Sequence, residues 1–293
     1  MTMIPSFDWK LDLGNRGVLT PGRWLWVRAT AWGLVLFGVA LAGFIASIAL
    51  ASWLKLPVAF SRLFAGVLPV LTTLIYAAAV RRFEKRAVTE FAIGNAPLEL
   101  AIGGLLGFGF IAAILLLLWS LGLYQVHAGH WKRWYDFFLF NSYISGVLEE
   151  LAFRAILLRI FARMIGPVGG LVISAALFGA AHAGHAPLVA SLQIALNSGL
   201  VTGLLYMVSG RLWLAIGLHI GLDFTEWSLL GVGDKSGLLA ISPVPGHSAL
   251  LTGGAFGPDG SILANVVALP MILGILAYIA WRSERPAPAR AAA

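Results

Sequence analysis

The chain has 293 residues, of which 59% are hydrophobic and only 11% are charged. This composition excludes a soluble domain of that length and indicates a polytopic membrane protein. The net charge of +7 does not indicate nucleic-acid binding, because the basic residues gather at the ends of apolar stretches, where they set membrane topology. The absence of cysteine excludes disulfides, thiol nucleophiles and cysteine metal sites. We therefore expect a lipid bilayer as a partner and no nucleic acid.

Eight apolar stretches follow one another along the chain, each long enough, or nearly so, to cross a bilayer as a helix. Helices are expected because the bilayer core contains no water to satisfy open backbone groups. A barrel would need alternating segments of about ten residues, and the hydrophobic spacing contains none. We predict an all-α polytopic membrane protein, a bundle of about eight transmembrane helices at residues 26–50, 63–80, 98–120, 137–160, 167–184, 187–208, 212–230 and 261–281.

The composition along the chain divides it into five parts. We predict a cytoplasmic segment at 1–25, N-terminal transmembrane helices at 26–96, a polar-motif core at 97–230, a loop rich in Gly and Pro at 231–260, and a last transmembrane helix with a basic tail at 261–293. A cytoplasmic N-terminus puts 14 of the 20 Lys and Arg residues on the cytoplasmic side. By the positive-inside rule we expect both termini in the cytoplasm. The expected location is the inner (cell) membrane of a bacterium.

Three ionisable side chains, Glu149, Glu150 and Arg154, lie in the middle of the fourth apolar stretch. Burying one such group at the bilayer centre costs about 3 kcal/mol or more, so it indicates a functional site. At 100° per residue, Glu150 and Arg154 lie one turn apart on one side of the helix, and we predict that they form an ion pair. Glu149 points about 100° away and has no cation within reach on its own helix. We expect it to find a partner on another helix, to bind a metal, or to take up a proton, as a general base does.

Two later stretches add imidazole and carboxyl groups. His182 follows Phe178 by four residues in the fifth stretch, and His219 precedes Asp223 by four residues in the seventh. A carboxylate one turn from a histidine fixes the orientation and tautomer of the ring. A lone histidine in an apolar helix is more often a packing residue, and the acidic pair of the fourth stretch could be a structural cluster of ion pairs. Three stretches that each place such groups near mid-depth favour a functional site instead.

Three motifs, in this order, resemble the CPBP family of intramembrane proteases. They are Glu-Glu-x-x-x-Arg at 149–154, Phe-x-x-x-His at 178–182 and His-x-x-x-Asp at 219–223. The family includes the type II CAAX prenyl endopeptidases and bacteriocin-processing or immunity proteins. The resemblance covers roughly residues 98–230, so residues 97–230 are predicted to be a CPBP-like catalytic core.

The resemblance implies an intramembrane peptidase whose substrate is a membrane-associated protein or a peptide. Glu149 and His182 would activate a water, and His219 and Asp223 would polarise the scissile carbonyl. The CAAX branch has Asn where this chain has Asp223, and a carboxyl group donates to an oxyanion only when it is protonated. Two further residues would support the site, which completes the catalytic set implied by the resemblance: Glu149, Glu150, Arg154, His182, His219 and Asp223.

Two mechanisms are compatible with this set. In one, no metal is bound and Glu149 takes the proton from a water that His182 orients. In the other, one divalent metal such as zinc is held by some of the nitrogen and oxygen ligands Glu149, His182, His219 and Asp223. The chain contains no His-Glu-x-x-His helix, the usual signature of zinc proteases. We favour the metal-free mechanism.

Two other classes of function remain open. A proton- or cation-coupled transporter would also use buried Glu, His and Asp side chains, but such transporters often contain a sequence repeat, and none is visible here. A non-catalytic membrane protein that gives immunity or binds peptides would not require every motif position to be retained.

Overall fold

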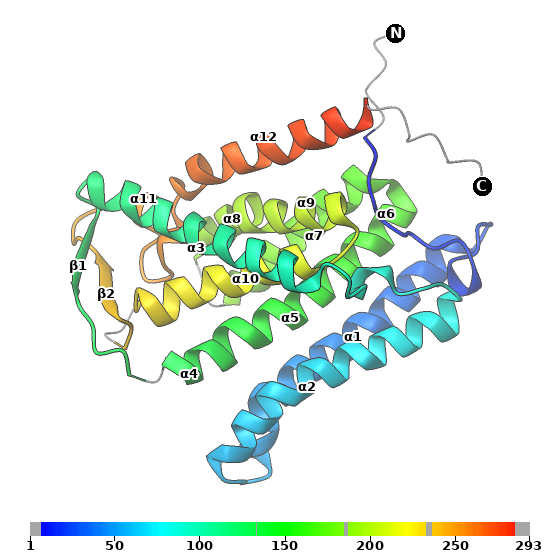
Figure 1. Ribbon diagram of the computed structural model, residues 1–293, viewed down its shortest axis with the longest axis horizontal. Coiled ribbons are helices and arrows are strands. Elements are labelled where there is room, and N and C mark those ends of the chain that lie inside the picture. Colours follow the sequence, from blue (N-terminus) through cyan, green and yellow to red (C-terminus); the bar gives the residue numbers. More distant parts are fainter. Residues whose placement is uncertain (1–6, 133, 185–186, 233–235, 285–293) are drawn as a thin grey trace.

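The computed structural model describes residues 7–132, 134–184, 187–232 and 236–284 (Figure 1). Within these ranges the chain forms eight long helical runs. Five of them are nearly uninterrupted: α1 (Leu25–Trp53), α2 (Val58–Ala79), which a wide π-helical turn extends to Glu84, α3 (Ala96–Ser120), α7 (Pro167–Ala181) and α12 (Ala264–Ser283).

The other three runs alternate α-helical and wider π-helical turns. The fourth run consists of α4 (Trp134–Phe137), α5 (Ile144–Glu150) and α6 (Arg159–Ile165), joined by π-helical stretches. The sixth consists of α8 (Leu188–Ile194) and α9 (Leu200–Ser209), and the seventh is α10 (Trp213–Asp223), extended to Leu229. Each predicted stretch falls on one run, so the all-α polytopic bundle is confirmed. Six of the runs in the described ranges are long and apolar enough to cross a membrane.

A two-stranded sheet lies at one end of the bundle (Figure 1). Strand β1 (Tyr124–Ala128) pairs antiparallel with β2 (Leu239–Pro243), with Tyr124 opposite Pro243. The segment 231–260, expected to be a loop, therefore supplies a strand, one turn of helix α11 (Ala249–Thr252) and a short 3-10 turn at Pro258–Gly260. The strand was missed because only five residues form it, among many glycines and prolines.

Helices α3 and α10 approach each other closely through glycine. A Cβ atom at Gly107 of α3 would collide with the carbonyl oxygen of Leu218, and one at Gly221 of α10 would collide with the carbonyl oxygen of Gly104. Small residues spaced in this way let transmembrane helices pack backbone against backbone. The contact fixes the position of α10, which carries His219.

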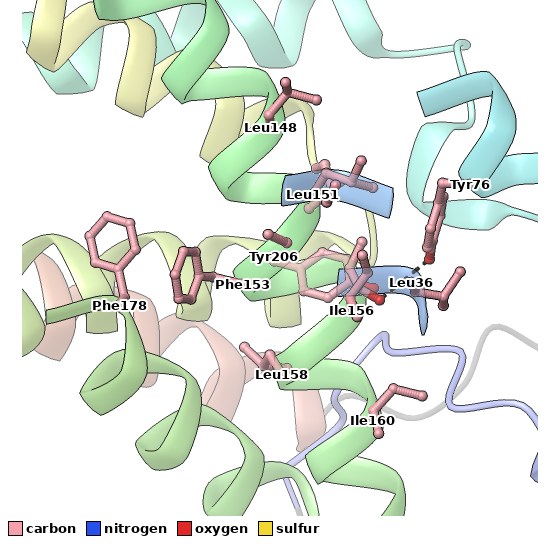
Figure 2. Packing of buried hydrophobic residues seen from close by; sticks show 14 of the residues in the cluster. Leu36, Tyr76, Leu148, Leu151, Phe153, Ile156, Leu158, Ile160, Phe178 and Tyr206 are labelled. Atoms are coloured by element: carbon pink, nitrogen blue, oxygen red, sulfur yellow. Dashed lines mark hydrogen bonds between the residues drawn. The ribbon is translucent and has the colours of Figure 1, made fainter. Parts of the chain in front are cut away.

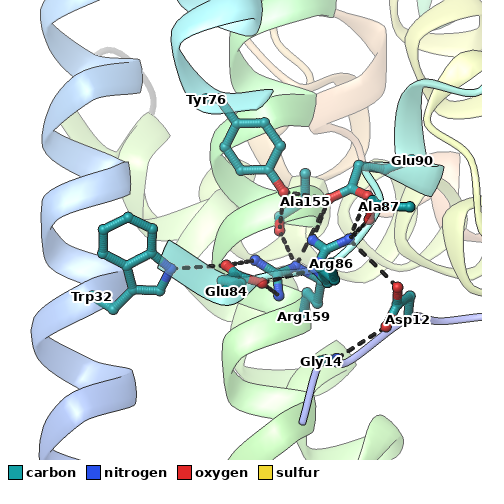
Figure 3. A network of polar contacts seen from close by, with 10 residues as sticks. All are labelled: Asp12, Gly14, Trp32, Tyr76, Glu84, Arg86, Ala87, Glu90, Ala155 and Arg159. Carbon is teal, nitrogen blue, oxygen red and sulfur yellow. Dashed lines mark hydrogen bonds and ion pairs between the residues drawn. The ribbon is translucent and has the colours of Figure 1, made fainter. Parts of the chain in front are cut away.

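A buried ionic network lies where α2 ends and ties four parts of the chain together (Figure 3). The guanidinium of Arg159 donates to both carboxylate oxygens of Glu84 at 2.7 and 2.8 Å, and Trp32 of α1 donates to the same carboxylate at 2.8 Å. Arg86 bridges Glu84 and Glu90 through bonds of 2.8 and 2.9 Å. Arg159 is fully buried. It therefore belongs to this network and is not simply one of the basic residues in the loops on the cytoplasmic side.

The pKa of Glu90 reflects this network. Burial raises it, but the hydrogen bonds and positive charge of Arg86 outweigh burial, so the pKa of Glu90 lies below its usual value of 4.5. Glu90 is therefore ionised and paired at neutral pH.

The two described ends of the chain meet. Ser283 of α12 accepts a hydrogen bond from the backbone N–H of Asp8 at 3.0 Å, and Arg282 donates to the carbonyl oxygen of Val208 at 2.8 Å. The first and last described residues therefore lie at the same end of the bundle, as expected for a chain that crosses the membrane an even number of times. The cytoplasmic location of that end stays a prediction.

Candidate active site

The fourth run is held in place by the main apolar core of the bundle (Figure 2). Leu148, Leu151 and Leu158 are each at most 1% exposed and pack in one cluster with Leu36 of α1 and Tyr206 of α9. A core packed on this side fixes the rotation of the run about its own axis. The charged residues between these leucines are therefore held in fixed directions.

Glu150 and Arg154 form the predicted ion pair inside the bundle. Nε of Arg154 lies 3.1 Å from Oε2 of Glu150, and both side chains are fully buried. Arg154 also donates from Nη2 to the hydroxyl of Thr202 in α9 and to the carbonyl oxygen of Gly199 at 3.4 Å. Its guanidinium carbon lies 4.3 Å from the centre of the Phe178 ring, a cation–π distance. The pair ties the fourth run to the fifth and sixth.

His219 lies among three carboxyl groups. Its Nδ1 is 2.8 Å from Oε1 of Glu150, while Nε2 is 3.5 Å from Asp223 and 4.0 Å from Glu149. An ionised carboxylate can only accept, so Nδ1 carries a proton and donates it to Glu150. The prediction that Asp223 sets the tautomer of His219 was wrong. Glu150 does so from another helix, because Asp223 lies beside the other ring nitrogen.

Glu149 differs from Glu150 in its surroundings. Its side chain is 21% exposed, whereas that of Glu150 is fully buried. Among the described residues, Oε2 of Glu149 has no hydrogen-bond partner, although Nε2 of His219 lies 4.0 Å away. The expected partner on another helix is therefore His219, whose Nε2 lies 4.0 Å from Oε2 of Glu149, beyond hydrogen-bond distance.

His182 presents one free nitrogen. Its Nδ1 lies 2.8 Å from the carbonyl oxygen of Phe178, which accepts a hydrogen bond from Nδ1–H, so Nε2 is the unprotonated nitrogen of the neutral ring. The ring centre of Phe178 lies 4.9 Å from that of His182 and 5.9 Å from that of His219. Phe178 thus packs beside both imidazoles. The ring centre of Phe256 lies 6.2 Å from that of His182.

A cavity of about 700 Å³ connects these groups. Glu149, His182, His219 and Asp223 line it, whereas Glu150 and Arg154 lie behind its wall. Another part of the wall is apolar and comes from α1, through Phe37, Leu41, Phe44 and Ile48. The site therefore combines a polar centre with an apolar surface.

Two further carboxyl groups line the cavity and were not assigned a role from the sequence. Glu226 lies two helical turns after His219 on the seventh run and is 2% exposed, while Asp259 follows Pro258 in a 3-10 turn and is 6% exposed. Burial raises the pKa of Asp259 above the usual value of an aspartate. Helical spacing places Glu226 on the same side of the seventh run as His219, so the sequence could have indicated it. No local sequence pattern indicates that residues 255–259 line the site.

The candidate metal ligands share the cavity without forming a ligand set. Among the residues that the structure describes, no group of three or more His, Asp or Glu side chains is arranged to hold a metal ion. Of the four candidates, His219 has its Nδ1 engaged by Glu150 and His182 has its Nδ1 engaged by a carbonyl group. Each imidazole therefore offers only Nε2.

The comparisons with known proteins agree with the motifs. Residues 131–225 match the model of the family described as type II CAAX prenyl endopeptidase Rce1-like. This match confirms the resemblance to the CPBP proteases, and all six residues of the implied catalytic set lie inside it. Comparison with curated proteins and with solved structures gives no match. The fourth to seventh helical runs thus resemble a protease family, in a multi-pass membrane protein.

Proposed function

We propose that the protein is an intramembrane endopeptidase that hydrolyses a peptide bond of a membrane-associated protein or peptide. The observation that carries this proposal is the convergence of Glu149, His182, His219 and Asp223 on one cavity of about 700 Å³. The match of residues 131–225 to a protease family supports the same activity. Neither the family match nor the cavity favours the transporter or the immunity protein over the peptidase.

Glu149 is proposed to be the general base. It is the partly exposed member of the acidic pair, and its Oε2 has no hydrogen-bond partner among the described residues. A water in the cavity can donate to the exposed part of the Glu149 carboxylate while it donates a second hydrogen bond to Nε2 of His182. Transfer of one proton to Glu149 then yields hydroxide, which attacks the carbonyl carbon of the peptide.

His219 and Asp223 are proposed to stabilise the oxyanion of the tetrahedral intermediate. Because Nδ1 of His219 donates to Glu150, this ring can also donate to an oxyanion only as the imidazolium, from Nε2. Asp223 lies 3.5 Å from that nitrogen and can donate to the oxyanion only while protonated. The proton on Glu149 then passes to the leaving amine, which restores the base.

Glu150 and Arg154 are proposed to position these groups. Glu150 holds the imidazole of His219 at 2.8 Å, and Arg154 holds Glu150 at 3.1 Å. Preorganised donors of this kind, in a cavity whose wall is partly apolar, act more strongly on a developing charge than they would in solvent. Since the proposed steps need only these residues and water, we propose that the reaction requires no metal.

The activity is tested by incubating the purified protein in lipid nanodiscs with a peptide library and identifying products by mass spectrometry. Wild type is expected to cleave, and Glu149→Gln is expected to lower kcat at least a hundredfold, because the amide keeps the shape but cannot accept the proton. The matched control is Glu284→Gln, which changes an exposed carboxylate at the end of α12. Cleavage by Glu149→Gln within tenfold of wild type would refute the role of Glu149.

A further inference from the structure

One buried nitrogen of Arg154 is left without a hydrogen bond. Nε lies 3.1 Å from Oε2 of Glu150, and Nη2 donates to Thr202 and Gly199. Among the described residues, Nη1 has no acceptor, although the side chain is fully buried. A buried donor without a partner costs free energy, because it has lost its hydrogen bonds to water. Another kind of contact is therefore needed to stabilise this guanidinium.

The aromatic ring of Phe178 supplies such a contact. Its centre lies 4.3 Å from the guanidinium carbon of Arg154, within the range in which the negative face of a ring attracts a cation. The two residues are only 2% and 0% exposed, and the attraction is strongest between desolvated groups. The ring of Phe153 lies farther from the same carbon, at 6.0 Å. Phe178 is therefore the main aromatic partner of Arg154.

The same ring lies beside both imidazoles of the site. Its centre is 4.9 Å from the ring centre of His182 and 5.9 Å from that of His219. The ring planes of Phe178 and His219 are nearly perpendicular, at 85°. Phe178 thus touches side chains from the fourth, fifth and seventh runs, all of which belong to the implied catalytic set.

Packing of α7 holds Phe178 in this place. The rings of Phe153 and Phe178 lie next to each other in Figure 2, with centres 5.2 Å apart and planes at 86°. Ser174 of α7 donates to the carbonyl oxygen of Phe153 at 2.6 Å, which joins the two runs one turn before the ring. At Gly179 a Cβ atom would lie 2.4 Å from the carbonyl oxygen of Ser191. The helix that carries Phe178 is therefore tightly packed on both neighbouring runs.

We propose that Phe178 is a positioning residue of the reaction, whose π face holds the guanidinium of Arg154. Arg154 lies 3.1 Å from Glu150, and Glu150 lies 2.8 Å from His219. A weaker face lets the guanidinium move, and the carboxylate that orients His219 moves with it. The inference rests on the proposed function, since it adds a residue to the same site.

The test changes the charge distribution of the ring and leaves its shape almost unchanged. Phe178 is replaced through an amber codon by phenylalanine that carries no, one, two or three fluorine atoms, each of which withdraws electron density from the face. In nanodiscs, kcat is expected to fall with each fluorine, on the order of tenfold over the series, while KM stays within about twofold. In mixed micelles, the equilibrium constant of unfolding is expected to rise in the same order, also on the order of tenfold.

The matched control is the same series at Phe110, which is 3% exposed and packs in a cluster of apolar side chains. There kcat and the unfolding constant should stay within about twofold. In the double variant Glu150→Gln with Arg154→Met, the unfolding constant should no longer depend on fluorine at position 178. A dependence that persisted there would show that the ring holds another group, and would overturn the proposal.

The kcat series decides the positioning role by itself. A kcat that does not change with fluorine at Phe178, or one that falls equally at Phe110, would overturn that role even if the unfolding constant changes. A fall in kcat that appears wholly as a rise in KM would do the same, because it would place Phe178 in substrate binding. Failure of wild type to cleave would refute the peptidase, whereas the unfolding series would still decide whether the ring holds Arg154.

Discussion

Arg154→Ala tests whether the buried ion pair holds the site together. The change leaves the carboxylate of Glu150 buried with His219 as its remaining partner and removes the donors to Thr202 and Gly199. Removing one partner of a buried pair costs about 3–5 kcal/mol. Because His219 still donates to Glu150, we expect a loss near the lower end, about 3 kcal/mol.

The loss is measured as the change in free energy of unfolding in mixed micelles titrated with a denaturing detergent. Arg81→Ala is the matched control, since Arg81 is exposed at the end of α2 and its loss should cost less than about 0.5 kcal/mol. The double variant Glu150→Gln with Arg154→Ala should be more stable than Arg154→Ala alone, because the stranded charge is gone.

The reasoning would be refuted if Arg154→Ala unfolds at the same free energy as Arg81→Ala. A double variant no more stable than Arg154→Ala would show that lost packing on Phe178, 4.3 Å from the guanidinium, and not the stranded charge, causes the damage. Arg154→Lys distinguishes the two further, since lysine keeps the charge but not the planar fork of donors.

Three further outcomes are expected. Gly107→Leu should lower stability far more than Gly109→Leu, because a side chain at Gly107 meets the backbone of α10 while Gly109 faces open space; equal midpoints in detergent unfolding would contradict the close packing. Asp223→Asn should keep or raise kcat if the reaction needs no metal, since an amide always offers a donor, whereas one zinc per chain by metal analysis, lost together with activity in the variant, would contradict the metal-free mechanism. The pKa of Glu90 is lowered on folding, so its contribution to stability is present above about pH 4.5 and is lost as the pH falls through the lower pKa of the folded state. Glu90→Gln should therefore reduce the fall in melting temperature that wild type shows below about pH 4.5. Equal slopes of melting temperature against pH for the two proteins in calorimetry would count against the network.

The bundle and the positions of the helices could be predicted because hydrophobic length decides them directly. The stretch expected at 212–230 is observed as a run from Trp213 to Leu229, and the ion pair of Glu150 with Arg154 follows from helical spacing within one run. Contacts within one helix depend on periodicity alone.

Contacts between runs could not be predicted in the same way. The pairing of Arg159 with Glu84 joins residues 75 positions apart, and the return of Asp259 to the cavity depends on how a glycine-rich segment folds back over the sixth run. The partner of His219 shows the limit most clearly. Spacing within the seventh run favoured Asp223, whereas the packing of α10 against the fourth run brings Glu150 within 2.8 Å.

The acidic pair at 149–150 thereby divides two tasks that one carboxylate could not perform together. A base must exchange protons with water, which requires a partly exposed carboxyl group, and the side chain of Glu149 is 21% exposed. A positioning group must stay immobile, which requires fixed partners, and Glu150 has them in its ion pair with Arg154 and its hydrogen bond with His219. Because adjacent helical residues point about 100° apart, the consecutive pair puts one carboxylate on the cavity wall and the other behind it. The same reasoning explains why Arg154 is buried at high cost: without it, the buried carboxylate that orients His219 would lose the cation that pairs with it.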